Sequence, residues 1–472
     1  MCDILLYSRS WQCDLYANLG VSLKERGFSV FHLVNNQSEA DRIRSIDSES
    51  SIYNLEVLID NFKVESKFKY YEDRYDISSM WRLIYADRHL STFSFEDLRS
   101  LTLSILGVLE NIFESKPFKF FLNEEVANFV AFSVYKIGSF YGCSYVGFCV
   151  PRNYSKSRFA FTNSWMSNFV ELDRVYSSPE IKLDNTSEAE KFIADFRENP
   201  KRPDYMLNQK EQSIFSFEFW NRLMSSFYLT TRDFFTVNSN SNFEFHGISR
   251  WNRFSWLFNY FRSIYQRKYY EVPRTGDSYV LFPLHFQPEA TTLVLAHLYE
   301  KQLTAIDIIA KSIPGDYLLY VKEHTTQLGH RTTQFYRDII KYPNVRLIAP
   351  STSTFELIRK AKTVICLTST VGWEALLLGK PVFVLGEVFY SKFKYAYQIK
   401  SSADLAKEFK LVSLPSTELY EQELVVFVQC YLNSLRRGSY LLGTEGVLSA
   451  QNIENLADSF ILYLREHYGM DI

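Results

Sequence analysis

Apolar residues in the second half of this chain alternate between two patterns, continuous short runs typical of buried strands and helical spacing typical of amphipathic helices. The runs predict strands at residues 279–283, 317–321, 345–348 and 363–367, and a further strand in the apolar run after Pro381, which ends at Leu385. Helical spacing predicts helices at residues 291–311, 330–341, 353–361, 371–378, 402–409, 416–433 and 452–468. Strands that alternate with helices in this way predict a parallel sheet with helices on both faces.

The N-terminal half begins with the same alternation. Strands are predicted at residues 3–8, 29–34, 119–123 and 144–150, and helices at 15–26, 95–113 and 126–141. The turn after the first strand, Tyr7-Ser8-Arg9-Ser10, lacks a GxGxxG pattern, which argues against a dinucleotide site there. Residues 126–150 carry one charge and are long enough to span a bilayer, but three glycines divide them. A buried helix–strand pair is therefore the preferred interpretation.

The predicted fold class is α/β, with two Rossmann-like domains that face a cleft and extra helices in the linker and at the C-terminus. The predicted boundaries give an N-terminal domain, an aromatic and basic helical connector, a C-terminal domain and a final helix, at residues 1–200, 201–276, 277–440 and 441–472. The connector has no acidic residue from 245 to 270 but has five basic residues, Arg250, Arg253, Arg262, Arg267 and Lys268. Two interpretations stay open, a helix that lies on an anionic membrane and, preferred, a packed connector.

Composition excludes several classes of function. The formal net charge of −2 gives no electrostatic footprint for nucleic acid. Six cysteines without metal-ligand spacing indicate buried thiols in a reducing compartment, and the N-terminal residues read as a strand rather than a signal peptide. The chain contains no DxD, HExxH or P-loop pattern, so no metal site is predicted.

Polar residues follow three of the predicted strands in the second half. The strand at 279–283 is followed by His285 and Gln287, and the strand at 317–321 by Lys322 and His324. The strand at 363–367 is followed by a hydroxyl turn and then by a helical carboxylate, Thr368, Ser369, Thr370 and Glu374. Strand ends of a parallel sheet share one edge, and a helix N-terminus favours anions, so these groups suit a pyrophosphate or a nucleotide phosphate ester. The alternative is an ordinary polar turn, and a lone His324 is more often structural.

The candidate site residues of the N-terminal half are carboxylates and arginines. Glu124 and Glu125 lie between a strand and a helix, where they either complement the helix dipole, which is preferred, or act as acid/base or nucleophile. Asp87 and Arg88 form either a local surface pair, which is preferred, or a polar loop at the cleft. Two arginines expected in the loop after the strand at 144–150 are candidates for binding an anionic acceptor, Arg152 and Arg158.

Several of these stretches resemble a known family. The segments FPLHFQPEA, YVKEH, NVRLIAP and STVGWEALLLGKPVFVLG, with Tyr390 after them, resemble the bacterial capsule and surface-polysaccharide biosynthesis family. That family includes β-Kdo transferases that act on capsule lipid anchors and is similar to other GT-B glycosyltransferases. The clear match covers about residues 281–393, and the N-terminal half matches only in general layout.

The resemblance implies a glycosyltransferase with a CMP-activated keto-sugar donor such as Kdo, a glycan or glycolipid acceptor in the N-terminal domain, and no further cofactor. It implies that His324 contacts the donor phosphate, which Ser369 and Thr370 also hold, and that Glu374 binds the ribose and Gln287 lines the donor site. The family often has proline where this chain has Thr325, a departure that predicts a looser loop. The expected location is the cytoplasm or the inner face of the cytoplasmic membrane.

Two other functions stay open. The EA…GKP element occurs in many GT-B enzymes and in sugar-nucleotide epimerases, so a UDP-sugar transferase or a UDP-sugar 2-epimerase is the second enzymatic hypothesis. The third hypothesis is a non-catalytic component of polysaccharide export or assembly.

Overall fold

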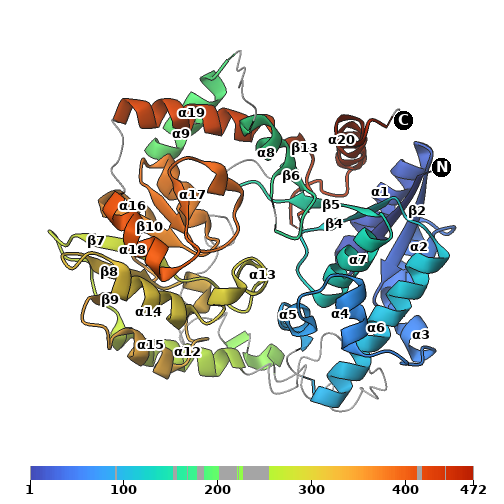
Figure 1. Ribbon diagram of the computed structural model, residues 1–472, viewed down its shortest axis with the longest axis horizontal. Helices are drawn as coiled ribbons and strands as arrows, with labels where there is room; N and C mark the ends of the chain where they lie inside the picture. The colour runs from blue at the N-terminus through green and yellow to red at the C-terminus, as the bar shows by residue number, and fades with distance from the viewer. Residues whose placement is uncertain are drawn as a thin grey trace. The chain divides into compact units, whose positions relative to one another are not determined.

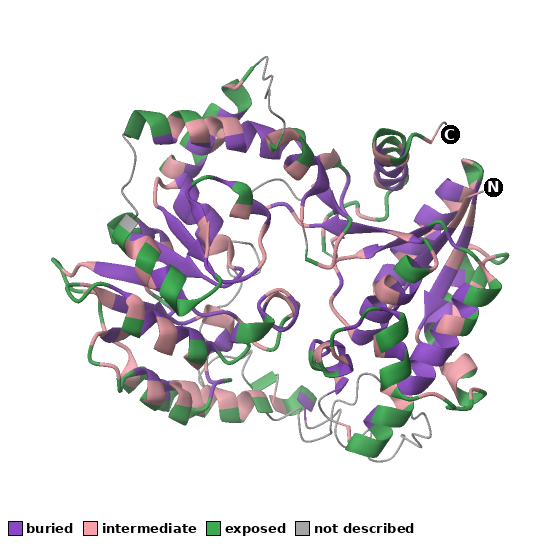
Figure 2. Ribbon diagram, viewed as in Figure 1, coloured by how far each residue is buried: buried purple, intermediate pink, exposed green. Residues whose placement is uncertain are grey.

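The structure is a computed structural model that describes residues 2–90, 93–152, 157–166, 168–177, 185–200, 220–221, 223–226, 255–411, 417–441 and 443–470. Contacts divide the chain into two compact units. The first unit contains residues 1–184, 293–295 and 427–472, and the second contains residues 185–292 and 296–426. Each unit is built on one sheet whose buried strands are flanked by helices (Figures 1 and 2). The α/β prediction with two mainly parallel sheets is therefore confirmed.

The sheet of the first unit has seven strands in the order β13-β6-β5-β4-β1-β2-β3. The five from β5 to β3 are parallel, and β6 and β13 add an antiparallel edge. Their bounds are Cys2–Tyr7 (β1), Phe28–Val34 (β2), Ser51–Asn54 (β3), Phe120–Glu124 (β4), Ser144–Cys149 (β5), Arg158–Thr162 (β6) and Arg436–Arg437 (β13).

Nine helices accompany this sheet among the described residues. They are Gln12–Glu25 (α1), Gln37–Ile46 (α2), Leu55–Asp60 (α3), Phe68–Arg74 (α4), Met80–Tyr85 (α5), Phe95–Ser115 (α6), Phe129–Phe140 (α7), Val170–Tyr176 (α8) and Ala450–Tyr468 (α20). One side chain of α20, Phe460, packs on rings from both β2 and β4, Phe28 and Phe120. The last helix of the chain thus completes the core of the first sheet.

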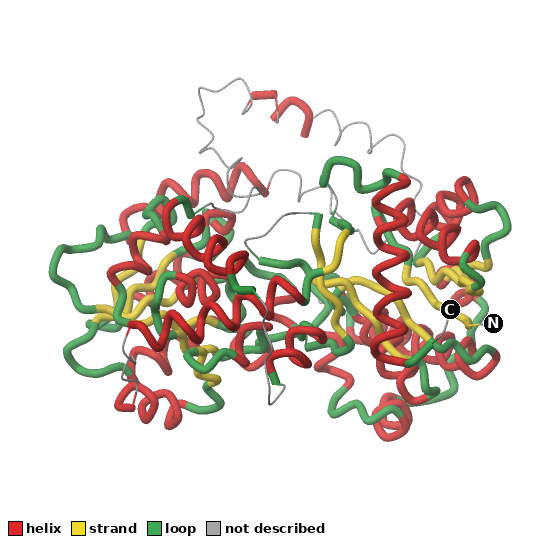
Figure 3. Tube along the Cα trace, turned by 90° about the horizontal axis from the view of Figure 1, so that it is seen from above, coloured by secondary structure: helices red, strands yellow, loops and turns green. Residues whose placement is uncertain are grey.

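The sheet of the second unit has six parallel strands in the order β12-β11-β10-β7-β8-β9. Their bounds are Tyr279–Pro283 (β7), Leu318–Lys322 (β8), Val345–Ile348 (β9), Thr363–Cys366 (β10), Val382–Val384 (β11) and Ala396–Gln398 (β12). Helices lie on both sides of the strands in the view from above (Figure 3). They are Ser187–Glu198 (α9), Ser255–Gln266 (α12), Ala290–Leu293 (α13), Gln302–Ser312 (α14), Thr333–Ile339 (α15), Thr354–Lys360 (α16), Thr370–Leu377 (α17) and Ser402–Leu411 (α18).

Four short 3-10 helices complete the second unit: Arg267–Tyr269 (η3), His297–Tyr299 (η4), Thr325–Gln327 (η5) and Phe389–Lys392 (η6). A further helix, Thr417–Asn433 (α19), crosses the division between the units. The short strands β3, β6, β12 and β13 are additions to the elements that the sequence predicts.

The predicted continuous helix at residues 291–311 is wrong, because the structure has α13, η4 and α14 in its place. Two backbone carbonyls in this stretch are bound from elsewhere. The Thr368 hydroxyl donates to the carbonyl of Thr291 at 2.9 Å, and the Gln287 amide donates to the carbonyl of Glu300. A carbonyl that accepts a hydrogen bond from another loop is not available for the i to i+4 hydrogen bond of a continuous helix. The chain therefore bends around the strand-end loops.

The division at 184/185 and 426/427 differs from the predicted boundaries at 200, 276 and 440. Contacts of α9 explain the first difference, because Arg197 donates to the carbonyl of Leu377 on α17 at 2.7 Å and pairs with Glu421 at 2.9 Å. Within the described residues, no helix is both long enough and apolar enough to cross a membrane. Residues 245–254 of the predicted connector lie outside the described residues.

Candidate functional site

Three neighbouring strands of the second sheet, β10, β7 and β8, bring the three predicted polar loops to one edge. Backbone contacts tie the strand ends together. The Leu284 N–H donates to the carbonyl of Lys322 at 2.9 Å, and the Thr368 N–H donates to Nε2 of His285 at 3.4 Å. The juxtaposition that the sequence predicts is therefore present within this unit.

His285 is buried and forms hydrogen bonds that connect several loops. Its backbone N–H donates to the Gln302 amide oxygen at 2.8 Å, and its carbonyl accepts from the Gln302 amide at 3.2 Å and from Arg331. Burial, with the positive charge of Arg331 as a lesser cause, lowers the pKa of His285 to about 3. The imidazole is therefore neutral at physiological pH.

The loop after β8 contains a buried ion pair beside the predicted residues. Glu323 accepts hydrogen bonds from Arg331 at 3.0 Å, from the Tyr336 hydroxyl at 2.7 Å and from the His324 N–H at 2.6 Å. Lys322 is buried, and its ammonium donates to the carbonyls of Pro350 at 3.1 Å and Glu323 at 3.5 Å. A buried pair of this kind fixes the backbone from which His324 projects.

His324 is partly exposed at the same edge. Its Nδ1 accepts from the Thr326 N–H at 3.3 Å and lies 2.6 Å from the Thr326 hydroxyl, so the side chain caps the short helix η5. Acceptance at Nδ1 places the proton of the neutral ring on Nε2. Burial, followed by the charges of Lys322 and Arg331, lowers the pKa of His324 to about 4. The ring is therefore a neutral donor through Nε2–H when no ligand is bound.

Gln287 and Gln327 join the loop after β7 to the loop after β8. The Gln287 N–H donates to the Gln327 amide oxygen at 3.1 Å, and the Gln327 amide donates to the Gln287 carbonyl at 3.2 Å. The Gln327 N–H also donates to the His324 carbonyl at 2.9 Å. Thr325 therefore sits in a loop that two hydrogen bonds between Gln287 and Gln327 join to the loop after β7.

The hydroxyl turn after β10 opens α17. The Ser369 hydroxyl caps the helix by accepting from the Val371 N–H at 3.1 Å, and its carbonyl accepts from Tyr390 at 2.6 Å. Ser369 and Thr370 are partly exposed, whereas Thr368 is buried. Because the first residue of a helix has no intrahelical acceptor for its N–H, the Thr370 N–H and the positive end of α17 are available to an anion.

Glu374 lies further along α17 and is buried. The edge of the second sheet therefore presents four partly exposed residues of the predicted set, Gln287, His324, Ser369 and Thr370. The others, His285, Lys322, Thr368 and Glu374, lie buried behind them.

A second polar cluster lies at the carboxyl ends of β1 and β4, neighbours in the first sheet. Arg9 donates to Oε1 of Glu124 at 2.6 Å. Burial raises the pKa of Glu124, and the positive charge of Arg9 opposes that rise. Glu124 is thus a partly exposed carboxylate that Arg9 orients.

The sequence interpretation missed Arg9, Gln12 and Tyr16, which surround Glu124. The Gln12 amide lies close enough to lower the pKa of Glu124, yet neither of its polar atoms completes a hydrogen bond among the described residues. The Tyr16 hydroxyl is likewise buried without a partner there, and the charge of Glu124 contributes to the raised pKa of Tyr16. The sequence did contain a pattern that could have indicated Gln12 and Tyr16, because they are one helical turn apart directly after the first strand.

The remaining candidates of the first unit have mainly structural contacts. Asp87 is buried, not at the surface as the preferred interpretation has it, and accepts from the backbone N–H groups of His89 at 2.9 Å and Phe129 at 3.0 Å. Arg88 is exposed. Arg158 is the first residue of β6 rather than part of a loop, a correction to its predicted place.

Arg152 and Glu125 lie near the end of β5. The backbone of Arg152 donates to the Tyr431 hydroxyl at 2.9 Å and accepts from it at 2.8 Å. Burial raises the pKa of Cys149, and the charge of Glu125 adds to that rise, which places Glu125 beside the thiol. These contacts put Arg152 and Glu125 at the edge that also carries Glu124.

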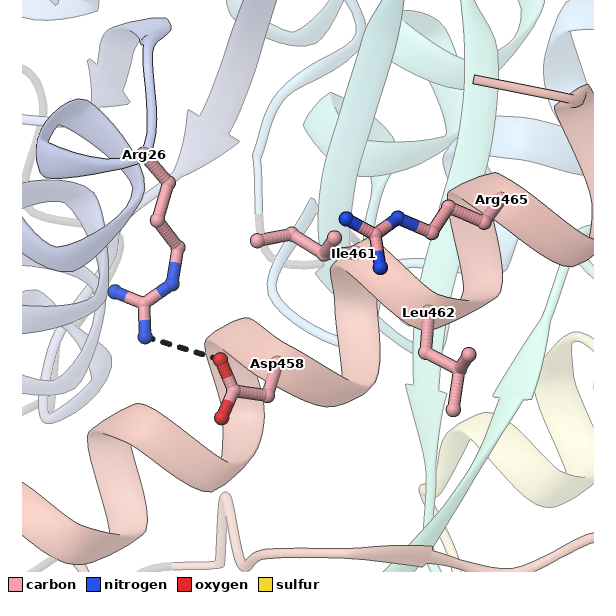
Figure 4. A pocket seen from close by; sticks show the side chains of 5 residues that line it. All are labelled: Arg26, Asp458, Ile461, Leu462 and Arg465. Carbon is pink, nitrogen blue, oxygen red and sulfur yellow. Dashed lines mark hydrogen bonds and ion pairs between the residues drawn. The ribbon is translucent and has the colours of Figure 1, made fainter. Parts of the chain in front are cut away.

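The first unit also has a pocket and a cluster of possible metal ligands, which share no residue with the polar clusters described above. A pocket of about 420 Å³ is lined by Arg26, Asp458, Ile461, Leu462 and Arg465, none of which the sequence predicts as a site residue (Figure 4). Arg26 donates there to Asp458 at 3.0 Å. Elsewhere Glu171, Glu466 and His467 gather closely enough to bind a metal ion, but the guanidinium of Arg436 already binds both carboxylates.

Comparison with known proteins identifies one family. Residues 193–424 match the family described as "Capsule polysaccharide biosynthesis protein". This match contains the motifs from about 281 to 393 and confirms the resemblance drawn from them. No curated protein matches the chain.

Solved structures with similarity to the chain include two enzyme types. A Thermosulfurimonas dismutans structure described as KpsC, beta Kdo 2,7 transferase, is 13% identical with a TM-score of 0.33, and the alignment covers 79% of this chain and 97% of that one. The beta Kdo 2,4 transferase of the same KpsC is 14% identical with a TM-score of 0.30, covering 73% and 87%. The UDP-GlcNAc 2-epimerase of Neisseria meningitidis is 11% identical with a TM-score of 0.24, covering 92% and 99%.

Proposed function

Because residues 193–424 of this chain match the capsule polysaccharide biosynthesis family, we propose that the protein is a glycosyltransferase of capsule or surface polysaccharide synthesis. Its donor is a CMP-activated keto-sugar such as Kdo, and its acceptor is a glycan or glycolipid. The observation that carries the proposal is the convergence of three strand-end loops around the N-terminus of α17. A phosphate there meets a hydroxyl, a backbone N–H and an imidazole N–H.

Each exposed group at this edge has a role toward the donor. Ser369 and the Thr370 N–H hold phosphate oxygens, with the positive end of α17 behind them. The Nε2–H of His324 donates to the same phosphate, and Lys322 supplies positive charge from the buried layer. Gln287 lines the site, and Glu374 reaches the ribose after a local rearrangement, because it is buried without ligand. These groups stabilise the departing phosphate without a metal ion.

In the reaction, the bond between the anomeric carbon and the phosphate oxygen breaks, and CMP leaves with the bonding electrons. A bond forms between the anomeric carbon and an acceptor hydroxyl oxygen, and the hydroxyl proton passes to a base. Glu124 is the residue proposed for this role, with Glu125 as substitute, because Arg9 orients its carboxylate at the strand end. A nucleophilic role of Glu124 uses the same carboxylate. Asp87, Arg88, Arg152, Arg158 and His285 have no direct role assigned in this step.

The proposed setting is a reducing compartment, at the inner face of the cytoplasmic membrane when the acceptor is a glycolipid. All six cysteines are free, in keeping with such a compartment.

A thermal-shift titration of the full chain with CMP, UDP, GDP and ADP, each with EDTA, tests the donor. A ligand at a hundred times its Kd stabilises the fold by about 2.7 kcal/mol. Stabilisation by CMP alone is the expected result. Stabilisation by UDP alone would replace the donor by a UDP-sugar, and formation of a sugar epimer without acceptor would then identify a 2-epimerase. No stabilisation by any nucleotide would favour a non-catalytic assembly component.

The variant Glu124→Gln separates binding from chemistry. We expect it to keep the CMP-induced stabilisation and to lose transfer of Kdo from CMP-Kdo to a glycolipid acceptor. Glu49→Gln, an exposed carboxylate on the same unit, is the control for removal of one negative charge. Full transfer activity in Glu124→Gln together with its loss in Glu125→Gln would move the role to the neighbouring residue.

A further inference from the structure

The helix α12 in the second unit has one packed face. Gln266 is fully buried and donates to the Arg331 carbonyl at 2.9 Å, and Asn259 lies 3.2 Å from the His330 ring. The helix backbone at Asn259 approaches so closely that a Cβ on Gly329 would lie 1.8 Å from the Asn259 carbonyl oxygen. This side of α12 is therefore fixed on the loop before α15.

The other face of α12 presents large apolar side chains to solvent. Phe258 is 68% exposed and Phe261 56% exposed, and Ile264 and Tyr265 are also exposed. Their spacing of three and four residues places them on one side of the helix. In Figure 2 the exposed residues follow the length of α12. Aromatic rings held in this way on a fixed helix form a ready surface for a partner.

Basic residues border this face. The Lys268 ammonium lies 3.8 Å from the centre of the Tyr265 ring, and Arg337 donates to the Tyr269 hydroxyl at 3.1 Å. The described residues 255–270 contain Arg262, Arg267 and Lys268 and no acidic residue, whereas the chain as a whole has a net charge of −2. Positive charge is thus concentrated beside the aromatic face.

We propose that this face of α12 docks on an anionic lipid membrane. Exposed Phe and Tyr rings enter the interfacial region of a bilayer, and Lys and Arg beside them attract anionic headgroups. A second copy of the chain fits less well, because a symmetric contact through this face would bring the two sets of basic residues together. The proposal is independent of the identity of the donor and acceptor.

Vesicle co-sedimentation of the full chain tests the proposal. We expect binding to vesicles of phosphatidylcholine mixed with phosphatidylglycerol and little binding to phosphatidylcholine alone, with affinity that falls as salt rises. The double variant Phe258→Ser/Phe261→Ser should bind the anionic vesicles at least about tenfold more weakly, because two rings no longer enter the interface. Lys268→Gln should weaken binding to the anionic vesicles and leave any residual binding to phosphatidylcholine unchanged.

The matched control is Phe95→Ser/Phe140→Ser on the first unit, whose rings are 57% and 52% exposed. This control should bind vesicles like the unaltered chain, and circular dichroism should show that both double variants are folded. Equal loss of binding in the control, or no vesicle binding by the unaltered chain, would overturn the proposal. Light scattering that shows a dimer dissociated by Phe258→Ser/Phe261→Ser, with vesicle binding unchanged, would assign the face to a second copy.

Discussion

Ser369 combines two functions in one side chain. Its hydroxyl caps α17 through the Val371 N–H, and in the proposed reaction it also binds the donor phosphate. Substitutions can separate the two roles, because glycine is an acceptable helix N-cap whereas alanine is a poor one.

We predict that Ser369→Ala lowers the free energy of unfolding by about 1 kcal/mol and Ser369→Gly by only a few tenths. Both variants lack the hydroxyl, so both should weaken CMP binding by a similar factor, worth about 1.5–3 kcal/mol. Urea denaturation measures the first quantity and calorimetric titration with CMP the second. Unchanged CMP binding in both variants would remove Ser369 from the donor site.

The lowered pKa of His285 makes the free energy of unfolding depend on pH. Its pKa is lowered to about 3 in the folded chain, so an imidazole that binds a proton near pH 6.5 when unfolded stays neutral when folded. Between these values the unfolded state binds more protons, and stability is lost as pH falls. The loss reaches at most about 1.4 kcal/mol per pH unit for this residue.

We predict that His285→Gln, which keeps a hydrogen-bond acceptor near the Thr368 N–H, has a shallower fall in stability between pH 6.5 and 4 than the unaltered chain. Urea denaturation across that range measures the slope. His297→Gln, an exposed imidazole on the same unit, is the control. Identical slopes for the unaltered chain and His285→Gln would show that protonation of His285 does not govern acid stability.

At the scale of the element, the start of α17 depends on close packing with η6. Gly372 lies where a Cβ would be 2.2 Å from the Tyr390 hydroxyl and 2.7 Å from the Cys366 sulfur. The same hydroxyl donates to the Ser369 carbonyl at 2.6 Å. A glycine in the helix thus permits the contact that fixes the hydroxyl turn.

We predict that Gly372→Ala destabilises the chain by about 1–3 kcal/mol, although alanine is the better helix former, because the added methyl displaces Tyr390. Tyr390→Phe removes the nearest clashing atom, so the double variant should be more stable than the sum of the two single effects predicts. Chemical denaturation of the four proteins measures the coupling. Additive effects would show that Tyr390 does not limit the space at Gly372.

At the scale of the whole molecule, the chain returns to its first unit after residue 426. The helix α20 contributes Phe460 to the core beside β2 and β4, whereas Ile306 of α14 belongs to the core of the second sheet. Because each unit has its own core, a core substitution should weaken mainly the unit that contains it.

We predict that Phe460→Ala costs about 3–5 kcal/mol in the first unit and increases amide hydrogen exchange in β1 and β4, while exchange in β7 and β8 and stabilisation by CMP stay unchanged. Ile306→Ala is the matched variant and should produce the opposite pattern. Hydrogen exchange read by mass spectrometry resolves the two sets of strands. Equal acceleration in all four strands after Phe460→Ala would mean that the units unfold together.

The sequence by itself determined the repeated strand–helix order and the polar ends of three strands. Apolar periodicity shows these features because a buried strand and an amphipathic helix each need a local pattern. The strand at 345–348 and the helix at 95–113 therefore appear almost as predicted. The motifs between about 281 and 393 likewise indicated the family.

Only the tertiary structure decided which polar residues are exposed and which are buried and hydrogen-bonded to other loops. His285, Glu323 and Asp87 have side chains typical of a site. His285 and Asp87 instead accept from the backbone N–H groups of Thr368 and Phe129, and Glu323 pairs with the Arg331 side chain, contacts that no local pattern encodes. The short edge strands and the break at 294–301 also depend on contacts far apart in sequence. Arg9 approaches Glu124 only because β1 and β4 pair across more than a hundred residues, so that ion pair follows from strand order rather than from either segment alone.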